Sequence, residues 1–343
     1  MGDDSTARPK RPTIYDVAVA AGVAPSTVSR TFARPGRVNA DTAARIRGAA
    51  RDLGYRTEPL ECGATGRTSM VALVIADVTN PFHFGIIRGA EEAAAGSNYT
   101  MVLADSQESA TRERELLDRV RRSVEGVVLA SPRMSDSAIR MIAKQVPAIV
   151  LNRAVPDVPS VVTDVPGGVR RAVRHLSALG HRSITYLAGP EASWADGMRW
   201  RALLEIAPEH DVKVRRLGPF APTVGGGKRA ARLIRKHPPT AVLAFNDLVA
   251  IGVLRELQAH GLQVPEDVSV VGFDDIFGAD LVSPGLTSVA APLRWLGDTA
   301  VKNLLAVIHG AQSRRGEPVR APTKLVVRGS TGPTGQQVAT RCD

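Results

Sequence analysis

From Ser69 onward, short apolar runs alternate with stretches of helical spacing, and this alternation limits the possible folds more than any other feature. Near-continuous apolar strands separated by amphipathic helices are typical of a parallel sheet covered on both faces. The expected strands are Met70–Ile75, Thr100–Ala104, Gly126–Ala130, Ala148–Leu151, Ser183–Leu187, Ala241–Phe245 and Ser269–Gly272. The expected helices are 85–95, 112–122, 169–179, 229–237 and 248–260, with Gly180 and Gly261 at their C-caps. This part of the chain is predicted to be an α/β domain.

The segment from Thr13 to Tyr55 has a different pattern, that of three short helices without a strand. Thr13 is a suitable N-cap for the first helix, and Asp16 in its first turn complements the helix dipole. Gly22 would end this helix, and Pro25 suits the first position of the next one. Two helices joined by a tight glycine turn form the helix-turn-helix pattern.

The second helix of this pattern separates apolar from polar side chains. Its apolar residues would close a small core with the first helix, from Val17, Ala21, Val23, Val28 and Phe32. Ser26, Thr27, Ser29 and Arg30 would then face outward, where hydroxyls can contact phosphates or bases and arginine can bind guanine in the major groove. After Asn39 as N-cap, a third helix would pack Ile46, Ala49, Ala50 and Leu53 on one side. A three-helix interaction module whose polar face only meets water is the alternative interpretation.

Length and charge indicate the number of domains and the kind of partner. The 343 residues suggest two or three folding units. We expect a flexible basic arm at 1–12, a helix-turn-helix domain at 13–57, a hinge linker at 58–68, an effector and dimerisation domain at 69–330 and a disordered tail at 331–343. The net charge of +10 favours a polyanionic partner, although many basic proteins bind no nucleic acid.

The cysteines and the N-terminus indicate the compartment. Only Cys62 and Cys342 are present, which argues against a disulfide framework and a cysteine-based zinc site and fits the cytoplasm. The first 12 residues lack an apolar core segment, and no run approaches about 18 uncharged apolar residues. Neither secretion nor membrane insertion is indicated.

The N-terminal motif resembles a known family. TIYDVAVAAGVAPSTVSRTF and VNADTAARIRGAARDLGY resemble the head of the lactose-repressor (LacI) and galactose-repressor family of bacterial regulators. The resemblance implies that Ser26, Thr27 and Arg30 read the groove. It places four further residues near phosphates: Thr13, Tyr15, Ser29 and Asn39. One position departs, because Ala24 stands where many members have a hydroxyl residue that caps the recognition helix.

The resemblance continues through residues 69–330, in DVTNPFHFGIIRGAEEAA, LGHRSITYLAGP, AVLAFNDLVAIGVLRELQAHGLQVPEDVSVVGFDD and LTSV. It implies an all-α helix-turn-helix head followed by an α/β periplasmic-binding-protein-like core, in which two parallel-sheet lobes flank a cleft and the chain crosses between them three times. Ligands bind outside the carboxyl ends of parallel strands. The implied effector residues are Phe82, His83, Asn152, Ser193, Arg199, Phe220, Asn246 and Asp274.

The chemistry of these residues fits a polyol. Amides and carboxylates at strand ends bind hydroxyls, Arg199 supplies a fork of donors, and Phe220 could stack on a sugar ring. Purines and phosphorylated metabolites remain open, since some family members bind them. Phe82 could also be ordinary core, and Trp194 and Trp200 could line the pocket or simply pack. We assign Asp247 and Asp275 to capping and no ligand role.

The sequence disfavours the hypothesis that this protein is an enzyme. Asp274 and Asp275 are adjacent on extended chain, so they point in opposite directions, and no clustered histidine joins them. GGGK at 225–228 fails as a phosphate loop because Pro222 and Arg229 stand where glycine and a hydroxyl residue are needed. We expect no catalytic residues, metal or cofactor. A secreted solute receptor would lack the helix-turn-helix, and a sugar kinase would need a nucleotide signature.

The resemblance implies a homodimer that binds a pseudo-palindromic DNA operator, with repression as the usual output. A small-molecule effector in the cleft would move the paired linkers and change DNA affinity. The sequence does not distinguish inducer from corepressor, and it identifies neither the effector nor the operator.

The hinge departs from the family pattern, in which the linker folds into a short helix on DNA and a leucine wedges into the minor groove. The expected leucine position falls on Gly63 or Ala64 here, and Leu60 is the only leucine nearby. Each interior glycine disfavours a helix by about 1 kcal/mol. Our hypothesis is that Leu60 serves as an imperfect wedge.

This hypothesis predicts that Leu60→Ala weakens operator binding, because the apolar wedge that kinks the DNA is lost. Titration of operator DNA with parent and variant measures the effect. Equal affinities would rule out Leu60 as the wedge.

Overall fold

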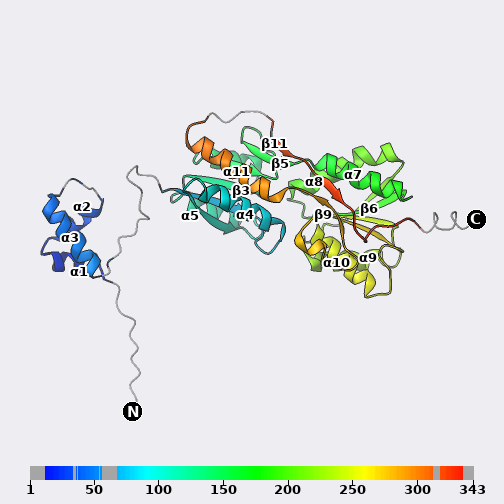
Figure 1. Ribbon diagram of the computed structural model, residues 1–343, viewed down its shortest axis with the longest axis horizontal. Helices are drawn as coiled ribbons and strands as arrows, with labels where there is room; N and C mark the ends of the chain where they lie inside the picture. Colours follow the sequence, from blue (N-terminus) through cyan, green and yellow to red (C-terminus); the bar gives the residue numbers. More distant parts are fainter. Residues whose placement is uncertain are drawn as a thin grey trace, which may run out of the picture. The chain divides into compact units, whose positions relative to one another are not determined.

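The computed structural model describes residues 12–33, 36, 38–53, 55, 68–311 and 317–334 (Figure 1). It divides into two compact units, Met1–Thr68 and Ser69–Asp343. The predicted arm at 1–11 and the predicted tail from 335 lie outside the described residues. The same holds for hinge residues 58–67, so the Leu60 hypothesis stays a prediction.

The first unit, here called the head, contains three helices: α1 (Ile14–Ala21), α2 (Pro25–Ala33) and α3 (Ala40–Asp52). The Asp16 carboxylate accepts hydrogen bonds from the backbone N–H and the hydroxyl of Thr13, at 2.6 and 2.7 Å. Gly22 ends α1 with a left-handed φ of 62°. The Asn39 side chain accepts from the Asp41 N–H at 2.9 Å at the start of α3. The predicted caps of α1 and α3 are therefore confirmed.

A small apolar core holds the head together. Its buried members are Val17, Ala18, Ala21, Val28, Ile46 and Ala50. Val23, Phe32 and Tyr55 pack against it half-buried, and the Phe32 and Tyr55 ring centroids lie 6.2 Å apart. The prediction for Leu53 was wrong: Leu53 follows the last turn of α3 and is 40% exposed.

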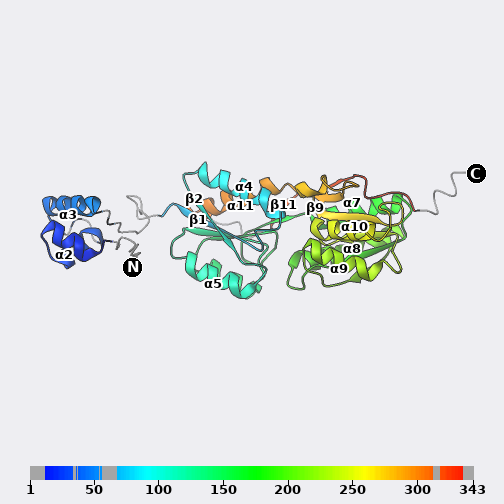
Figure 2. The ribbon, with the colours of Figure 1, turned by 90° about the horizontal axis from the view of Figure 1, so that it is seen from below.

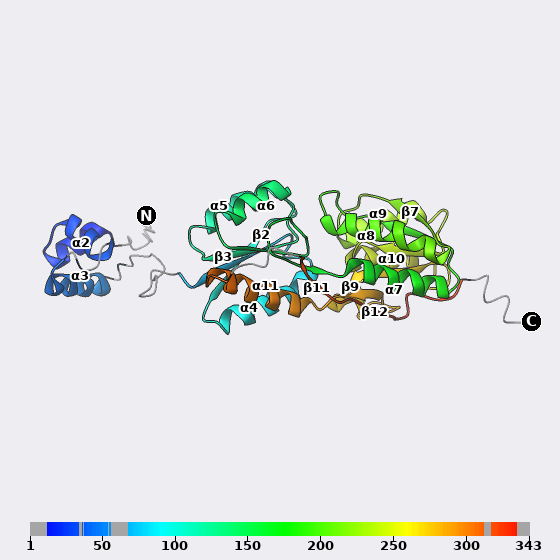
Figure 3. The ribbon, with the colours of Figure 1, turned by 90° about the horizontal axis from the view of Figure 1, so that it is seen from above.

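The second unit begins with a six-stranded parallel sheet, which forms the first lobe. Its strands, in spatial order, are β11 (Val319–Ala321), β5 (Ser160–Thr163), β4 (Ala148–Leu151), β3 (Gly126–Ala130), β1 (Met70–Ile75) and β2 (Thr100–Asp105). Helices α4 (Phe82–Ala95) and α11 (Leu293–Ile308) lie on one face, and α5 (Ala110–Val120) and α6 (Asp136–Ala143) on the other (Figures 2 and 3). Alternate residues of β1 serve the two faces: Leu73 belongs to one apolar cluster and Val74 to the other.

The second lobe has the same architecture. Its sheet runs β12 (Lys324–Val326), β10 (Thr287–Ala290), β9 (Ser269–Asp274), β8 (Ala241–Ala244), β6 (Ser183–Leu187) and β7 (Lys213–Leu217), with β12 antiparallel to β10. The helices of this lobe are α7 (Val165–Ala178), α8 (Trp194–Ile206), α9 (Val224–Ile234) and α10 (Asp247–Gln258), with short 3-10 turns η1 (Ala207–His210) and η2 (Phe277–Ala279). The chain crosses between lobes after β5, after β10 and after β11, as expected.

Glycines let the backbones of α4 and α11 touch. A Cβ on Gly89 would lie 1.9 Å from the Arg294 carbonyl oxygen, and one on Gly297 would lie 2.0 Å from that of Ile86. No side chain fits at either position. This packing fixes α11, which follows the second crossing, against the first lobe.

The predicted strands and helices are present, with bounds that differ by a few residues. Helices α6, α8 and α11 and strands β5, β7, β10, β11 and β12 were missed. The predicted tail at 331–343 was wrong in its first four residues. The Thr331 hydroxyl bonds the His175 ring at 2.9 Å, and the Thr334 N–H donates to the Leu179 carbonyl at 3.0 Å, so this segment is held on the second lobe.

No helix within the described ranges is long and apolar enough to cross a membrane.

At the start of α2, the Ala24 carbonyl accepts from the N–H groups of Thr27 and Val28, at 2.9 and 3.3 Å. Ala24 is therefore at the N-cap and has no side-chain acceptor to offer.

We predict that Ala24→Ser stabilises α2 by about 1 kcal/mol, because the hydroxyl can accept a free N–H of the first turn. Amide exchange in the full-length protein should slow about fivefold in α2. Ala20→Ser, on the exposed side of α1, is the matched control. Unchanged exchange in α2 would contradict the cap assignment.

Candidate functional site

The exposed face of α2 carries the predicted DNA-reading side chains. Ser26, Ser29 and Arg30 are exposed and Thr27 is half-buried, whereas Val28 on the opposite side is fully buried. Arg30 forms no ion pair with any residue that the structure describes, so its guanidinium is available. The face thus presents hydroxyls and one free arginine.

The predicted phosphate-contacting residues surround the helix starts. Tyr15 is exposed on α1. Thr13 and Asn39 are also exposed, but their side chains already bond Asp16 and Asp41 as caps. Asn39 keeps its amide N–H groups for a phosphate, whereas Thr13 would have to release a donor from Asp16.

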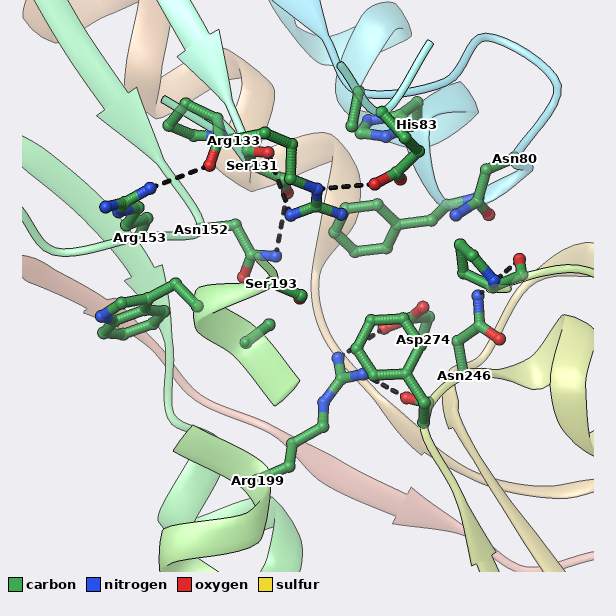
Figure 4. A pocket seen from close by; sticks show the side chains of 18 residues that line it. Asn80, His83, Ser131, Arg133, Asn152, Arg153, Ser193, Arg199, Asn246 and Asp274 are labelled. Atoms are coloured by element: carbon green, nitrogen blue, oxygen red, sulfur yellow. Dashed lines mark hydrogen bonds and ion pairs between the residues drawn. The ribbon is translucent and has the colours of Figure 1, made fainter. Parts of the chain in front are cut away.

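In the second unit, a pocket between the lobes brings together seven of the eight predicted effector residues (Figure 4). They are Phe82, His83, Asn152, Ser193, Arg199, Asn246 and Asp274. Phe220 is not among the lining residues, because its ring is buried in the apolar core. Phe245, at the end of β8, lines the pocket as an aromatic residue in its place.

An ion pair anchors the second-lobe side of the pocket. Arg199 of α8 donates to the Asp274 carboxylate at 3.1 Å and also to the Phe245 carbonyl. Its guanidinium lies 3.8 Å from the centroid of the Phe273 ring. Burial raises the pKa of Asp274 to about 6, although Arg199 opposes the rise. The pair presents one donor group and one acceptor group to a ligand.

Two further polar residues of this lobe start helices. The Ser193 hydroxyl accepts from the Asp196 N–H at 3.3 Å, and the Asn246 side chain accepts from the Val249 N–H at 3.0 Å. Asn246 also donates to the Pro222 carbonyl at 3.3 Å. These bonds fix both side chains at the cleft, because each helix start lies just beyond a strand end.

Asp247 and Asp275, to which we assigned no ligand role, make contacts within the fold. Asp247 is fully buried and accepts from the Ser288 hydroxyl at 2.6 Å and from the Ile276 N–H at 2.8 Å. Burial raises its pKa well above the usual range. Asp275 pairs with Arg328 at 2.8 Å.

The two tryptophans in question differ. Trp194 lines the pocket. Trp200 instead stacks on Tyr186, with ring centroids 6.0 Å apart. Of the two, only Trp194 is placed to contact a ligand.

The first lobe supplies the opposite wall. The Asn152 amide donates to the Ser131 hydroxyl at 3.2 Å and accepts from the Thr163 hydroxyl at 2.8 Å. Arg133 extends into the pocket beside Asn152 (Figure 4) and pairs with Glu108 at 2.6 Å. Polar groups therefore converge on the cleft from both lobes.

His83 is buried at the start of α4, and its Nδ1 has no hydrogen-bond partner. Burial lowers the pKa of His83 to about 4, nearby Arg133 lowers it too, and Asp77 acts in the opposite direction. The ring is therefore neutral near pH 7, and it can donate or accept one hydrogen bond.

Backbone conformation also marks the pocket. Four of its lining residues have left-handed φ values, namely Glu108 (59°), Ser131 (56°), Asn152 (60°) and Asp274 (107°). Such residues cost free energy and gather at ligand sites, where neighbouring contacts hold them.

Sequence reasoning missed several lining residues: Asn80, Glu108, Ser131, Arg133, Arg153 and Phe245. Ser131 directly follows β3 and could have been found by the strand-end rule that indicated Asn152. Arg133 had no such signal, because its direction depends on the loop after Ser131.

The free space among these side chains is about 30 Å³. This volume suits one or two water molecules, while ligand pockets typically measure hundreds of Å³. A ligand therefore requires the lobes to separate or Arg133 and Trp194 to move. No group of three or more metal-ligating side chains occurs in the described part of the chain.

The pKa of His83 predicts a dependence of stability on pH. The pKa of His83 is 6.5 in the unfolded chain and about 4 in the folded protein. Between these two pH values, therefore, only the unfolded chain binds this proton. Stability is fully present above pH 6.5 and is lost as pH falls toward 4, by roughly 3 kcal/mol. Over the same fall in pH, the free energy of unfolding of the parent should decrease by roughly 3 kcal/mol more than that of His83→Gln.

Urea unfolding followed by tryptophan fluorescence measures this, since Trp194, Trp200 and Trp295 all lie in the second unit. Asp274, whose pKa is raised, acts in the opposite direction but is common to both proteins. His237→Gln, at an exposed position, is the control. Parallel loss of stability in parent and His83→Gln would show that the buried imidazole is not responsible.

Comparison with known proteins agrees with this geometry. Residues 13–58 match the family model "Bacterial regulatory proteins, lacI family", and residues 173–331 match "Periplasmic binding protein-like domain". The chain is 31% identical to the transcriptional repressor CytR of Escherichia coli K12, over 93% of this chain and 96% of CytR. It is 34% identical to the regulator CelR of Thermobifida fusca, over 94% and 99%.

Solved structures give the same result. A CelR–cellobiose complex superposes with a TM-score of 0.68 at 32% identity, covering 93% of this chain and all of that one. A lac repressor dimer bound to operator and an anti-inducer gives 0.72 at 26%, covering 94% and 100%. Together with the head and the two-lobed core, these matches show that the chain belongs to the LacI family of bacterial DNA-binding transcriptional regulators.

Proposed function

We propose that this protein is a cytoplasmic repressor that binds a pseudo-palindromic operator as a homodimer and responds to an uncharged sugar between its lobes. The observation that carries the proposal is the pocket itself, in which Asn152 and Arg133 face Arg199, Asn246 and Asp274. A ligand bound there contacts both lobes at once. It can therefore bias their arrangement.

The operator contact falls to α2. Arg30 is the residue we assign to a guanine, because its guanidinium can bind the O6 and N7 edge with two hydrogen bonds. Ser26 and Thr27 contact bases beside it. The phosphate contacts fall to Thr13, Tyr15, Ser29 and Asn39, which set the orientation of the head on the duplex.

The charge balance of the pocket supports an uncharged ligand. Each pocket arginine already has a carboxylate partner: Arg133 has Glu108, Arg153 has Asp136 and Arg199 has Asp274. His83 is neutral because burial lowers its pKa. A phosphorylated effector would add negative charge where the cations are already neutralised. Phosphorylated metabolites are therefore disfavoured as effectors.

The polar groups that remain suit hydroxyls. Asp274 accepts and Arg199 donates, while Asn152 and Asn246 can do both. The rings of Trp194 and Phe245 can cover the apolar face of a sugar ring. Related structures contain cellobiose in one case and ribose in another, the latter a regulator from Enterococcus faecalis with 31% identity.

The dimer contact falls to an apolar patch that includes both lobes. Phe84 of α4 and Phe277 of η2 stack with centroids 6.2 Å apart, although they are 47% and 65% exposed. Leu281 nearby in sequence is also exposed. A partner chain that buries Phe84 and Phe277 would sense any change between the lobes, which gives the effector a route to the paired heads.

We predict that a neutral sugar raises the melting temperature of the second unit and that Asp274→Asn weakens its binding about 100-fold, since charge-assisted hydrogen bonds are lost. The panel comprises ribose, galactose, cellobiose, ribose 5-phosphate and guanine, measured by thermal shift and calorimetry. Asp280→Asn, at an exposed carboxylate, is the control.

A shift with ribose 5-phosphate or guanine alone would overturn the assignment of ligand class. Unchanged sugar affinity in Asp274→Asn would instead move the site away from the described pocket.

A further inference from the structure

A second cavity lies on the outer face of the first lobe, between α5 and α6, which lie on the same face of the sheet (Figure 3). Its volume is about 400 Å³, far more than the free space in the pocket between the lobes. We call it the α5–α6 groove. It is lined by Arg114, Asp118, Arg121, Met134, Ser135, Ser137, Ala138, Met141, Ile142 and Gln145.

The groove combines an apolar surface with a single free cation. Met134 and Ile142 are buried, while Met141 is 54% exposed at its edge. Arg121 is paired with Asp118 at 3.2 Å. Arg114 is exposed and has no hydrogen-bond or ion-pair partner among the residues described. Methionine side chains adapt to varied apolar shapes, and a free guanidinium binds a carboxylate with two hydrogen bonds.

We propose that the α5–α6 groove is a second ligand site, which takes a small amphiphilic monocarboxylate. The carboxylate pairs with Arg114, and the apolar body covers Met134, Met141 and Ile142. The volume is within the usual range for small-molecule pockets, roughly 300 to 1,000 Å³. One free cation specifies one negative charge.

The groove shares a loop with the pocket between the lobes. In residues 131–135, Ser131 and Arg133 line the pocket, while Met134 and Ser135 line the groove. The buried Glu113 of α5 accepts from the N–H groups of Arg133 and Met134, at 2.8 and 3.1 Å. Arg153 donates to the Met134 carbonyl at 2.8 Å.

These bonds make the loop a single rigid piece, so a ligand that displaces Met134 also displaces Arg133. The groove ligand therefore changes the wall of the effector pocket. This link rests on the proposed function of that pocket, whereas ligand binding in the groove does not.

Calorimetric titration of the full-length protein with octanoate tests the site, with octanamide as the uncharged counterpart. We expect one saturable site per chain, and Arg114→Gln should weaken octanoate binding about tenfold without affecting octanamide. Met141→Glu should abolish binding of octanoate. Arg119→Gln on α5 and Leu204→Glu on α8 are matched exposed controls outside the groove and should bind like the parent.

All these positions are exposed, so unchanged thermal melting confirms that each variant folds. Absence of saturable binding, or equal octanoate affinity in parent, Arg114→Gln and Met141→Glu, overturns the site. Binding of an acidic peptide without octanoate binding also overturns it, in favour of a protein partner.

Amide hydrogen exchange tests the link. With octanoate at saturation, exchange of residues 131–135 should slow several-fold in the parent and stay unchanged in Met141→Glu. Unchanged exchange in the parent, despite bound octanoate, overturns the coupling between groove and pocket.

Discussion

Arg199 carries a permanent positive charge at a position that is only 4% exposed, and the second lobe is arranged to compensate for it. A buried unpaired charge would cost several kcal/mol. The compensation comes from Asp274 at the end of β9, the Phe245 carbonyl at the end of β8 and the face of the Phe273 ring. One side chain of α8 thereby fixes two strand ends, and those strand ends form the floor of the pocket.

The first lobe also pairs its pocket arginine with a carboxylate, on the opposite wall of the pocket. Arg133 is neutralised by Glu108, and its loop is held by the buried Glu113. Because each lobe satisfies its own charges, the lobes can move apart without exposing an unpaired ion. A neutral polyhydroxyl ligand can then add hydrogen bonds to both walls, which is the differential contact that a change in lobe arrangement requires.

Much of this site could be predicted from the sequence, since Asn152, Asn246 and Asp274 end or follow apolar strands whose carboxyl ends share one edge. The position of Phe220 could not, because whether a loop ring enters the core or the cleft depends on packing; Phe245 occupies the cleft instead. Strand β7, KVRRL, lacks an apolar pattern because it is an edge strand with exposed side chains. Residues 331–334 have a loop composition but are held by His175 and Leu179, contacts distant in sequence.

We propose that the face of α2 reads a specific DNA sequence as part of a symmetric dimer. Selection of binding sites from random duplex DNA by the full-length protein tests it most directly, with Arg30→Ala selected in parallel. The parent should enrich a two-fold symmetric site, and Arg30→Ala should show an altered or lost preference at the position that Arg30 contacts. A folded, dimeric protein that enriches no sequence would contradict it.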